Sequence, residues 1–394
     1  MQQGIVQSEF ENRRLALYLA GLTDREPGGA DQPFSSQDTV TIGARESPNR
    51  VKRKLQQIFE GAIDRRYEAY CREAQVFFAS VDATAAFSVY AGDNRTRFGS
   101  PTIVKSRLLA DRDSFGVLLP LNRMRHWSEV VGLSQRDRPY HEKNDTLVWR
   151  GVTTGAFFEQ ADVGVARSRR HLAELESLSP GIDAKFTSLV QQGTAPDPAL
   201  VARVQARMAP PLTIEEQLAS KFLLSLEGND VASGLKWMMA SNSTVIMPKP
   251  TCESWFCEGE LVPWVHYVPV RHDLADLNEV YAWCLSHDDT CHGIAQAGRA
   301  YAAQFVDGER ELALARAVVR GYLRCSDVTL EYPLSERLRQ RLNGRSLDRE
   351  FAQLRGWLDA LGEGLGAVPE QLDTRDAGYH AGGVAGDAGD VDRL

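Results

Sequence analysis

Short apolar runs alternate with polar, glycine-containing loops along much of the chain, and residues 221–250 show this pattern most clearly. The apolar run 222–226 has the length of a buried strand, and it ends in a polar loop that contains Gly228 and Ser233. A helical run, LKWMMAS, follows the loop, and the β-branched run STVIMP predicts a second buried strand closed by proline. A strand, a glycine loop, a helix and a strand in this order form a unit that can hold a phosphate group.

The same alternation predicts strands and helices on both sides of this unit. Further short buried-strand candidates lie at residues 76–94, 101–107, 115–121, 146–151 and 261–270. Helical patterns lie at residues 47–74, 168–178, 275–287, 291–306, 308–325 and 347–366. Strands and helices that take turns along a chain predict an α/β fold with parallel sheets and helices on both faces.

The chain of 394 residues is too long for one ordinary core, so its layout predicts two Rossmann-like domains that face each other across a cleft. Open α/β sheets bind ligands at the carboxyl ends of their strands, and we therefore expect the loops after Val148 and Leu226 to share one crevice. The predicted parts are an N-terminal domain, a C-terminal domain, a helix that packs back on the N-terminal domain and a disordered tail. Their bounds are 1–142, 143–345, 346–368 and 369–394.

The composition, with 43% hydrophobic and 25% charged residues, is that of an average soluble globular protein. A formal net charge of -8 and a pI near 5.6 argue against general nucleic-acid binding, which requires a concentrated basic surface. No apolar run reaches the roughly 18 residues of a membrane span, and the first residues lack the basic-then-apolar order of a signal peptide. We expect a cytoplasmic protein, and peripheral contact with a membrane surface stays open.

The six cysteines are too few to form a disulfide framework in a chain of this length. Cys252, Cys257, Cys284 and Cys291 lie near several histidines, and zinc binding is one interpretation of this region. Neither cysteine pair has the close spacing of a structural zinc knuckle. The prediction is therefore thiols in a reducing compartment and no metal site.

The glycine loop in EGNDVASG offers backbone N–H groups, the Ser233 hydroxyl and, early in the next helix, Lys236. Unpaired N–H donors at the start of a helix favour a phosphate, and Lys236 could reach a diphosphate there. The alternative is an ordinary turn in which Ser233 caps the helix and Lys236 lies on a solvated face.

A second glycine loop follows the strand predicted at 146–151, and arginines gather around it. They are Arg150, Arg167, Arg169 and Arg170, and the loop itself holds Gly151 and Thr153. Arginine forks match phosphate oxygens in two-point contacts, and the alternative is an arginine-rich face in contact with water. Further basic residues at Lys105, Arg107 and Arg125 indicate a positive cleft.

Asp93 stands on a turn directly after a strand-like run, in AGDNRTR, where a carboxylate can project into a cleft. It could take a proton from an attacking hydroxyl group, and the alternative is an aspartate that stabilises the turn. Glu253 and His266 are comparable candidates in the second half. A single histidine in an apolar setting such as PWVHYVPV is more often a core residue.

Taken together, these segments resemble family 90 of the glycosyltransferases. The family includes the Rumi-type protein O-glucosyltransferases, fungal capsule-associated transferases and bacterial LpsA-type lipopolysaccharide core transferases. The segments LEGNDVASGLKWMMASNSTVIMP, CESWFCEGELVPWVHYVPV, DLADLNEVYAWC and GIAQAGRAYAAQF follow in the family's order, and LVWRGVTTG and GSPTIVKSR extend the resemblance to roughly residues 85–305. An ordered series of motifs is more specific than one glycine loop, and the form looks more like the bacterial branch.

The resemblance implies an inverting transferase of the two-Rossmann GT-B architecture that takes a UDP-sugar, needs no cofactor and requires no divalent metal. Asp93 takes the position of the family's general base. Gly234 stands where eukaryotic members have an arginine, so Lys236 or a cation of the first domain would have to replace that arginine. The residues assigned to nucleotide-sugar binding are Arg150, Gly151, Thr153, Arg167, Arg169, Gly228, Ser233, Lys236 and Glu253.

The predicted reaction moves a sugar from a UDP-sugar to a hydroxyl group of a glycan or glycolipid acceptor. The expected acceptor is the lipopolysaccharide core or another bacterial surface glycan, reached in the cytoplasm, with contact at the inner membrane surface left open. One alternative is a protein O-glycosyltransferase of the O-glucosyl or O-xylosyl type, and another is a nucleotide-sugar-binding module without catalysis. An unrelated nicotinamide-dependent oxidoreductase would need a glycine fingerprint that the first strand–helix unit lacks.

Overall fold

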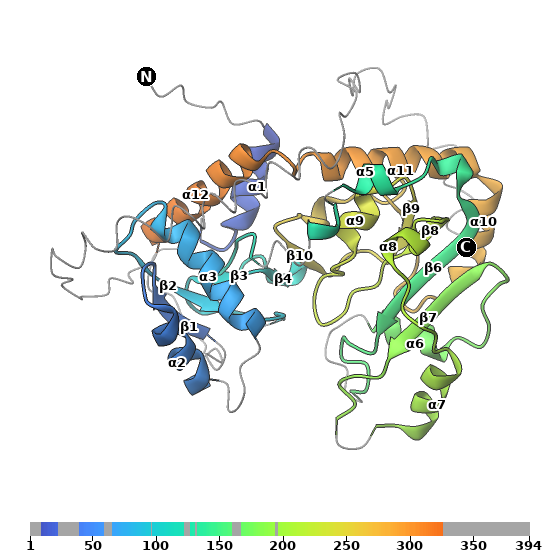
Figure 1. Ribbon diagram of the computed structural model, residues 1–394, viewed down its shortest axis with the longest axis horizontal. Coiled ribbons are helices and arrows are strands. Elements are labelled where there is room, and N and C mark those ends of the chain that lie inside the picture. Colours follow the sequence, from blue (N-terminus) through green and yellow to red (C-terminus); the bar gives the residue numbers. More distant parts are fainter. Residues whose placement is uncertain are drawn as a thin grey trace.

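The computed structural model describes residues 9–22, 39–58, 65–95, 97–121, 127–130, 132–159, 167–193 and 196–325. These residues form an α/β structure with one main sheet toward each end of its long axis, the first on the left and the second on the right of Figure 1. The predicted α/β class is therefore confirmed. The helix expected at 346–368 and the tail expected at 369–394 lie outside the described residues.

The first sheet has four strands in the order β1-β2-β3-β5. They are β1 (Thr39–Gly43), β2 (Ala86–Tyr90), β3 (Thr102–Val104) and β5 (Gly116–Leu118). The strands β2, β3 and β5 are parallel, and the edge strand β1 runs antiparallel to β2. This sheet is thus mixed, although the sequence predicts a parallel one.

Two helices, α2 (Pro48–Ile58) and α3 (Arg65–Ala79), confirm the helical pattern predicted at 47–74. The helix α3 continues beyond that range and includes Phe77 and Phe78, which the sequence places in a strand. Both side chains are buried together with those of Tyr70 and Ala74. The apolar run extends the buried face of the helix at helical spacing, and for that reason it does not form a strand.

The second sheet has five strands, all parallel, in the order β11-β9-β8-β6-β7. They are β6 (Asn144–Val152), β7 (Ile182–Ser188), β8 (Ser220–Leu224), β9 (Thr244–Met247) and β11 (Val268–Pro269). In chain order this is the 2-1-3-4-5 arrangement of a doubly wound sheet, and its connections change direction between β6 and β8. Every residue of β8 and β9 is buried, as expected for central strands covered on both faces.

Six helices accompany the second sheet in the part of the chain that the structure describes. They are α6 (Ser168–Glu174), α7 (Pro198–Ala206), α8 (Ile214–Gln217), α9 (Leu235–Ala240), α10 (Leu277–Ser286) and α11 (Asp288–Ala303). Capping side chains determine where two of these helices begin. Asp197 caps α7 just before Pro198, and Thr213 and Glu216 form a capping box on α8. The helix α11 packs on α9 and β9, and its buried residues close one side of the core.

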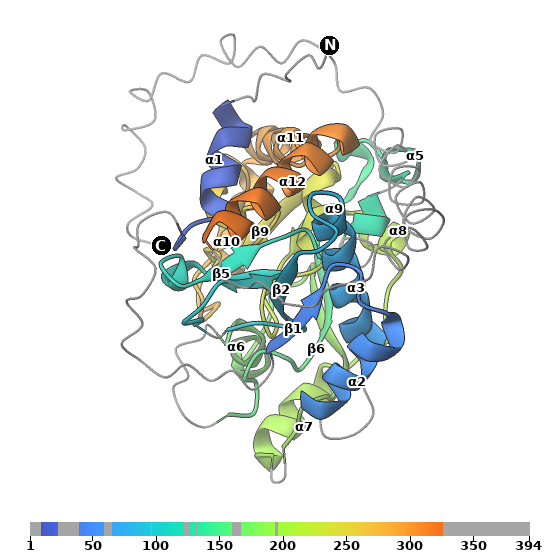
Figure 2. The same cartoon turned by 90° about the vertical axis from the view of Figure 1, so that its left-hand side faces the viewer.

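The chain returns to the first half with α12 (Gly308–Cys325), which contacts α3 and α1 (Glu9–Tyr18). Figure 2 shows α1 and α12 next to each other above the first sheet. The buried Arg14 of α1 donates to Glu311 of α12 at 2.8 Å, and the Tyr322 hydroxyl lies 3.0 Å from the backbone N of Ser88 in β2. This return comes before residue 346, within the range that the sequence assigns to the second domain.

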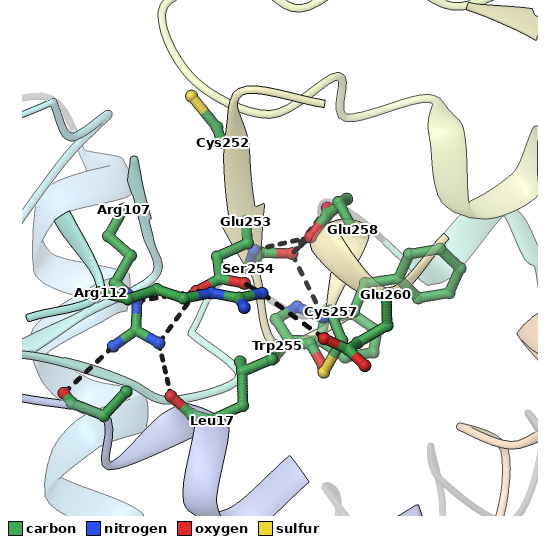
Figure 3. Close-up of polar contacts among 12 residues, drawn as sticks. Leu17, Arg107, Arg112, Cys252, Glu253, Ser254, Trp255, Cys257, Glu258 and Glu260 are labelled. Carbon is green, nitrogen blue, oxygen red and sulfur yellow. Dashed lines mark hydrogen bonds and ion pairs between the residues drawn. The ribbon is translucent and has the colours of Figure 1, made fainter. Parts of the chain in front are cut away.

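A small two-stranded sheet joins the two halves. In it β4 (Ser106–Leu108) pairs antiparallel with β10 (Cys252–Ser254). Figure 3 shows Arg107 of β4 and Arg112 directed at Glu253 of β10. Glu253 Oε1 accepts from Arg107 Nε at 2.9 Å, and its Oε2 lies 2.6 Å from Arg112 Nη2. The side chains of Arg107 and Glu253 are both fully buried, so this ion pair lies inside the junction.

The prediction of a strand at 261–270 is wrong for most of this range, because only β11 near its end is a strand. Trp264 has a φ of 64°, and the backbone around it turns. Pro263 has no N–H to give to a ladder, which explains why the apolar run does not extend the sheet.

The remaining described elements are short. They are α5 (Leu133–Arg136) and the 3₁₀ turns Leu109–Asp111, Ser128–Val130, Tyr140–Glu142 and Glu258–Glu260. None of the helices described combines the length and the apolar content needed to cross a membrane.

Candidate active site

A cavity of about 650 Å³ lies between the two halves of the molecule, a volume that suits a small ligand. The first half lines it with Tyr67, Tyr70, Tyr90, Ala91, Gly92, Asp93 and Lys105. The second half lines it with Val152, Thr154, Arg169, Val190, Gln191, Gly228, Asn229, Asp230, Val231 and Ser233. Its second-half wall contains the loops after β6 and β8, which is where a doubly wound sheet of this order binds its ligand.

The loops after β6 and β8 touch each other, as the sequence predicts. A Cβ atom on Gly155 would lie 2.6 Å from the carbonyl oxygen of Gly228, and Gly155 has a φ of 87°. A Cβ atom on Gly228 would in turn lie 2.8 Å from Thr154 Oγ1. Both glycines are therefore needed for this close approach, which brings the backbones of the two loops together at the cavity.

Arg169, in the first turn of α6, is a cation at the point where β6 and β8 diverge. Its Nη1 donates to the carbonyl oxygen of Val152 at 3.0 Å and to Thr154 Oγ1 at 2.6 Å, and its Nη2 donates to the carbonyl oxygen of Leu226 at 2.9 Å. Its Nε is buried without a hydrogen-bond partner. Burial lowers the pKa of Arg169 to about 10, and the charge of Glu227 opposes this shift.

No carboxylate forms a salt bridge with Arg169 among the residues that the structure describes. Its guanidinium group bonds only neutral oxygens, and Glu227 acts on it through its charge without a hydrogen bond. An anionic ligand in the cavity would supply a direct charged contact. Arg169 therefore provides the electrostatic condition for binding a phosphate group.

Asp93 lies on the turn after β2, where the sequence predicts it, and its side chain keeps 33% of its surface exposed at the cavity. Lys105 Nζ donates to Asp93 Oδ1 at 2.6 Å, and Asn229 Nδ2 donates to Asp93 Oδ2 at 3.1 Å. The carboxylate is thus held by one residue from each half of the molecule. It can also accept a hydrogen bond from a ligand, because part of the carboxylate is exposed at the cavity.

Lys105 and Asp230 lie next to Asp93. The sequence alone counts Lys105 among the basic residues and gives Asp230 no role in the site. Both side chains are buried, and Lys105 Nζ lies 3.0 Å from Asp230 Oδ2. Burial lowers the pKa of Lys105, but Asp230, Tyr70 and Asp93 outweigh it and raise this pKa above its ordinary value. Burial raises the pKa of Asp230, and the charge of Lys105 works against that shift.

Three residues of β6 and its loop that the sequence assigns to nucleotide-sugar binding make contacts within the protein instead. Arg150 Nη2 forms a salt bridge of 2.6 Å with Asp183. The Thr153 hydroxyl donates to the carbonyl oxygen of Val190 and accepts from the N–H of the same residue, both at 2.8 Å. A Cβ atom on Gly151 would lie 2.3 Å from the Trp149 ring. These contacts shape the loop, and none of the three assigned residues lines the cavity.

The region around α9 differs from its sequence interpretation. Ser233 is exposed and lines the cavity, whereas Gly234 takes the N-cap position without a side-chain hydrogen bond. Lys236 is fully buried, and its Nζ lies 2.6 Å from Glu258 Oε1. Lys236 is therefore neutralised within the protein and does not face the cavity.

The other predicted residues lie away from the cavity lining. Arg167 donates to the carbonyl oxygen of Glu159 at 2.8 Å, and Arg170 pairs with Glu174 at 2.8 Å. Glu253 belongs to the ion pair between β4 and β10 described above. The half-buried His266 accepts a hydrogen bond from the N–H of Val262 at 3.0 Å, as a satisfied histidine does, and Arg125 lies outside the described residues.

All six cysteines are free thiols. Cys71, Cys252, Cys257, Cys284 and Cys291 are buried, and Cys325 is exposed. Within the described ranges no group of three or more histidine, cysteine, aspartate or glutamate side chains has an arrangement that could hold a metal ion. That the reaction requires no divalent metal stays a prediction.

The model of the family described as glycosyl transferase family 90 matches residues 107–324, more than half of the chain. The O-glucosyltransferase LpsA of Dichelobacter nodosus is 33% identical over 242 residues, which cover 60% of this chain and 66% of that protein. Protein O-glucosyltransferase 1 of Rattus norvegicus is 25% identical over 162 residues, or 41% of this chain and 37% of the relative. Protein O-glucosyltransferase 2 of Danio rerio is 35% identical over 89 residues, which cover 23% of this chain and 18% of that protein.

The matched regions thus cover 66% of the LpsA relative and much smaller parts of the two animal proteins. The family match includes most of β4 and α12 and the whole second sheet, and it contains every second-half residue of the cavity lining. This chain belongs to glycosyl transferase family 90.

Proposed function

We propose that the protein is an inverting glycosyltransferase that moves a sugar from a UDP-sugar to a hydroxyl group of a glycan acceptor. The donor diphosphate lies against Arg169 and the loops after β6 and β8, and the acceptor hydroxyl lies against Asp93. The two sheets then act as the two Rossmann-like domains of a GT-B enzyme, with the cavity as their cleft.

One observation carries this proposal: Asp93 from the first half and Arg169 from the second half line the same cavity. Direct displacement at an anomeric carbon needs a proton acceptor beside the attacking hydroxyl and a stabilised leaving group on the other side of the sugar. The carboxylate is suited to the first task, and the guanidinium group, which forms no salt bridge within the described residues, is suited to the second.

Asp93 and Arg169 can account for the proton and the charge that move in the transfer step. The acceptor oxygen forms a bond to the anomeric carbon while the bond from that carbon to the β-phosphate oxygen breaks. The acceptor proton passes to Asp93, and the electron pair of the broken bond stays on UDP, where Arg169 stabilises the added negative charge. Attack on the face opposite the leaving group inverts the anomeric configuration.

The names of the relatives support glucose as the first donor sugar to test, since all three relatives described above are called O-glucosyltransferases. The similarity to LpsA favours a bacterial surface glycan, such as the lipopolysaccharide core, over a folded protein domain as acceptor. We place the reaction in the cytoplasm, at or near the inner membrane surface, with no nucleic acid involved. In this proposal Arg169 and the backbone N–H groups of the two loops stabilise the diphosphate, and the reaction needs no divalent metal.

A second candidate is a nucleotide-sugar-binding module without catalysis. It is favoured by the engagement of both Asp93 oxygens, by Lys105 and Asn229, and by the neutralisation of Lys236 by Glu258. Donors bonded to a carboxylate stabilise its charge and weaken it as a base.

Calorimetric binding to UDP-, GDP- and CMP-sugars, followed by product analysis, separates these candidates. We expect selective binding of one UDP-sugar and transfer to oligosaccharide acceptors, with an anomeric coupling constant in NMR that reports inversion. A retained configuration would contradict the mechanism. Tight UDP-sugar binding with neither transfer nor hydrolysis would favour the binding module, and transfer to a folded protein domain alone would favour a protein O-glycosyltransferase.

A further inference from the structure

Asn229 connects three loops at the cavity through its side-chain amide. Its Nδ2 donates to Asp93 Oδ2 at 3.1 Å, and its Oδ1 accepts from the N–H of Gly155 at 3.0 Å. The opposite amide orientation would place an NH₂ group against the Gly155 N–H and an oxygen against the carboxylate, and both contacts would be repulsive. The neighbours therefore determine the orientation of this amide, and it links Asp93 to the loop after β6.

Asp230, the next residue, enters the first half of the molecule. Its Oδ2 accepts from Ser106 Oγ at 2.6 Å and lies 3.0 Å from Lys105 Nζ. The backbone N–H of Asn94, the neighbour of Asp93, also donates to this oxygen at 3.4 Å. Asp230 is 4% exposed, so these are buried contacts of a charged group that needs all of them.

Lys105 completes the arrangement, because its ammonium group bridges Asp230 and Asp93 Oδ1. Arg95, on the same turn as Asp93, donates to the carbonyl oxygen of Gly228 at 2.7 Å and also bonds the carbonyl oxygen of Asn229. The turn that carries Asp93 and the loop after β8 are thus joined by side chains that reach across from both sides.

We propose that Asn229 and Asp230 are positioning residues for the reaction: they fix the Asp93 carboxylate against the loops that hold the donor diphosphate. This inference rests on the proposed function, in which Asp93 is the base. Asn229 sets the direction of Oδ2, and Asp230 anchors Lys105, which sets the direction of Oδ1. The distance between base and leaving group is then a property of the folded protein, present before any substrate binds.

The substitution Asn229→Asp tests this role with almost no change in shape. It keeps the oxygen that accepts from Gly155 and replaces the donor to Asp93 by a second negative charge. We expect kcat to fall by about 10²-fold because the base is misplaced and repelled, and the KM for the donor to rise by a smaller factor because the new charge also faces the cavity.

The pH profile supplies a readout that loss of structure alone would not change. A charge opposite Asp93 favours its protonated form, so the acid limb of kcat moves to higher pH in Asn229→Asp. In Asn229→Ala, which loses the hydrogen bond without adding charge, kcat falls less and the acid limb moves in the same direction by a smaller amount. The other titratable groups of the cavity, namely Lys105, Asp230, Arg169, Tyr67, Tyr70 and Tyr90, are the same in all these proteins.

Asn278→Asp is a matched control, because the amide of Asn278 also makes two hydrogen bonds, but away from the cavity and to backbone groups alone. It accepts from the N–H of Ser179 and donates to the carbonyl oxygen of Ser177. Turnover is followed as transfer or as slow hydrolysis of the donor, and Asp93→Asn is measured in parallel. An inactive Asp93→Asn together with an unchanged kcat and pH profile in Asn229→Asp would overturn only the positioning role. An active Asp93→Asn would overturn that role and the proposed base together.

Discussion

Lys105 Nζ lies 2.6 Å from Asp93 Oδ1, and the ammonium group is buried whereas the carboxylate reaches the cavity. The same ammonium lies 3.0 Å from Asp230, so one positive charge is shared by two carboxylates. This cluster joins the turn after β2 to the loop after β8. It explains how a carboxylate at a strand end of the first half is kept in place beside a ligand site of the second half.

Removal of the shared cation should damage both stability and turnover. In Lys105→Met the buried Asp230 loses its ion-pair partner, and we expect a loss of about 3–5 kcal/mol in the free energy of unfolding. The turnover of the remaining folded protein should also fall. Urea unfolding and kcat of the folded fraction measure the two effects. Lys54→Met is a control, since Lys54 pairs with Glu46 at a partly exposed site; equal losses in both variants would contradict the role of the buried cluster.

Arg169 should be the cation that carries nucleotide affinity. Charge-assisted hydrogen bonds contribute about 1.5–3 kcal/mol each, so Arg169→Gln should weaken UDP binding by roughly ten- to a hundredfold. The control is Arg170→Gln, one residue along, where the guanidinium pairs with Glu174 on the helix surface. Calorimetry with UDP compares the variants. Equal affinity in Arg169→Gln and the unchanged protein would remove Arg169 from the diphosphate site.

The close approach of the two loops should depend on Gly155. In Gly155→Ala the new Cβ would lie 2.6 Å from the carbonyl oxygen of Gly228, and the residue would keep a positive φ. Gly193 also has a positive φ, but a Cβ atom there would have no neighbour within 4 Å. Positive φ costs about 1–2 kcal/mol for an alanine at either site, so a larger loss of stability and of UDP affinity in Gly155→Ala than in Gly193→Ala isolates the loop contact. Thermal unfolding with and without UDP measures both the stability and the UDP affinity. Equal losses in the two variants would argue against a role for the contact between the loops.

Glu253 should behave as a structural residue. Glu253→Ala leaves Arg107 buried without its partner, and we expect a loss of about 3–5 kcal/mol in stability with UDP affinity of the folded fraction unchanged. Glu260→Ala removes a partly exposed partner of Arg112 and should cost at most about 1 kcal/mol. Loss of UDP binding in folded Glu253→Ala would instead support the sequence-based assignment of this residue to the nucleotide-sugar site.

Removal of divalent metal should leave transfer intact. With Arg169 as the counter-charge of the diphosphate, the rate after EDTA treatment should equal the rate before it, and added Mg²⁺ should not raise it. A rate that disappears with EDTA and returns with Mg²⁺ would show that a metal shares the leaving-group role.

The sequence predicts the parts of the site that follow from local patterns. Asp93 follows an apolar run and precedes turn formers, and the glycine loops after β6 and β8 stand between recognisable strands and helices. The short strands β1 and β10 escape prediction, because three to five residues carry too little periodicity. The run that ends α3 is ambiguous for the same reason, since a short apolar run does not by itself distinguish a strand from a buried helix face.

Long-range pairing is the part that the sequence does not reveal. Lys236 and Glu253 are charged residues next to the loop motifs, and nothing local indicates that Glu258 and Arg107 neutralise them in the core. Asn229 and Asp230 lie inside the glycine loop and carry no local signal of their role, because Asp93 and Ser106, to which they bond, are more than 120 residues away. Their importance depends on which segments the fold brings together.

The most direct measurement compares kcat and UDP affinity in Asp93→Asn and in the unchanged protein. Asp273→Asn, a surface substitution outside the cavity, controls for the loss of a carboxylate. If Asp93 is the base, kcat falls by about 10²- to 10⁴-fold while UDP binds with unchanged affinity. Unchanged turnover in Asp93→Asn would contradict the proposed mechanism, whatever its effect on binding.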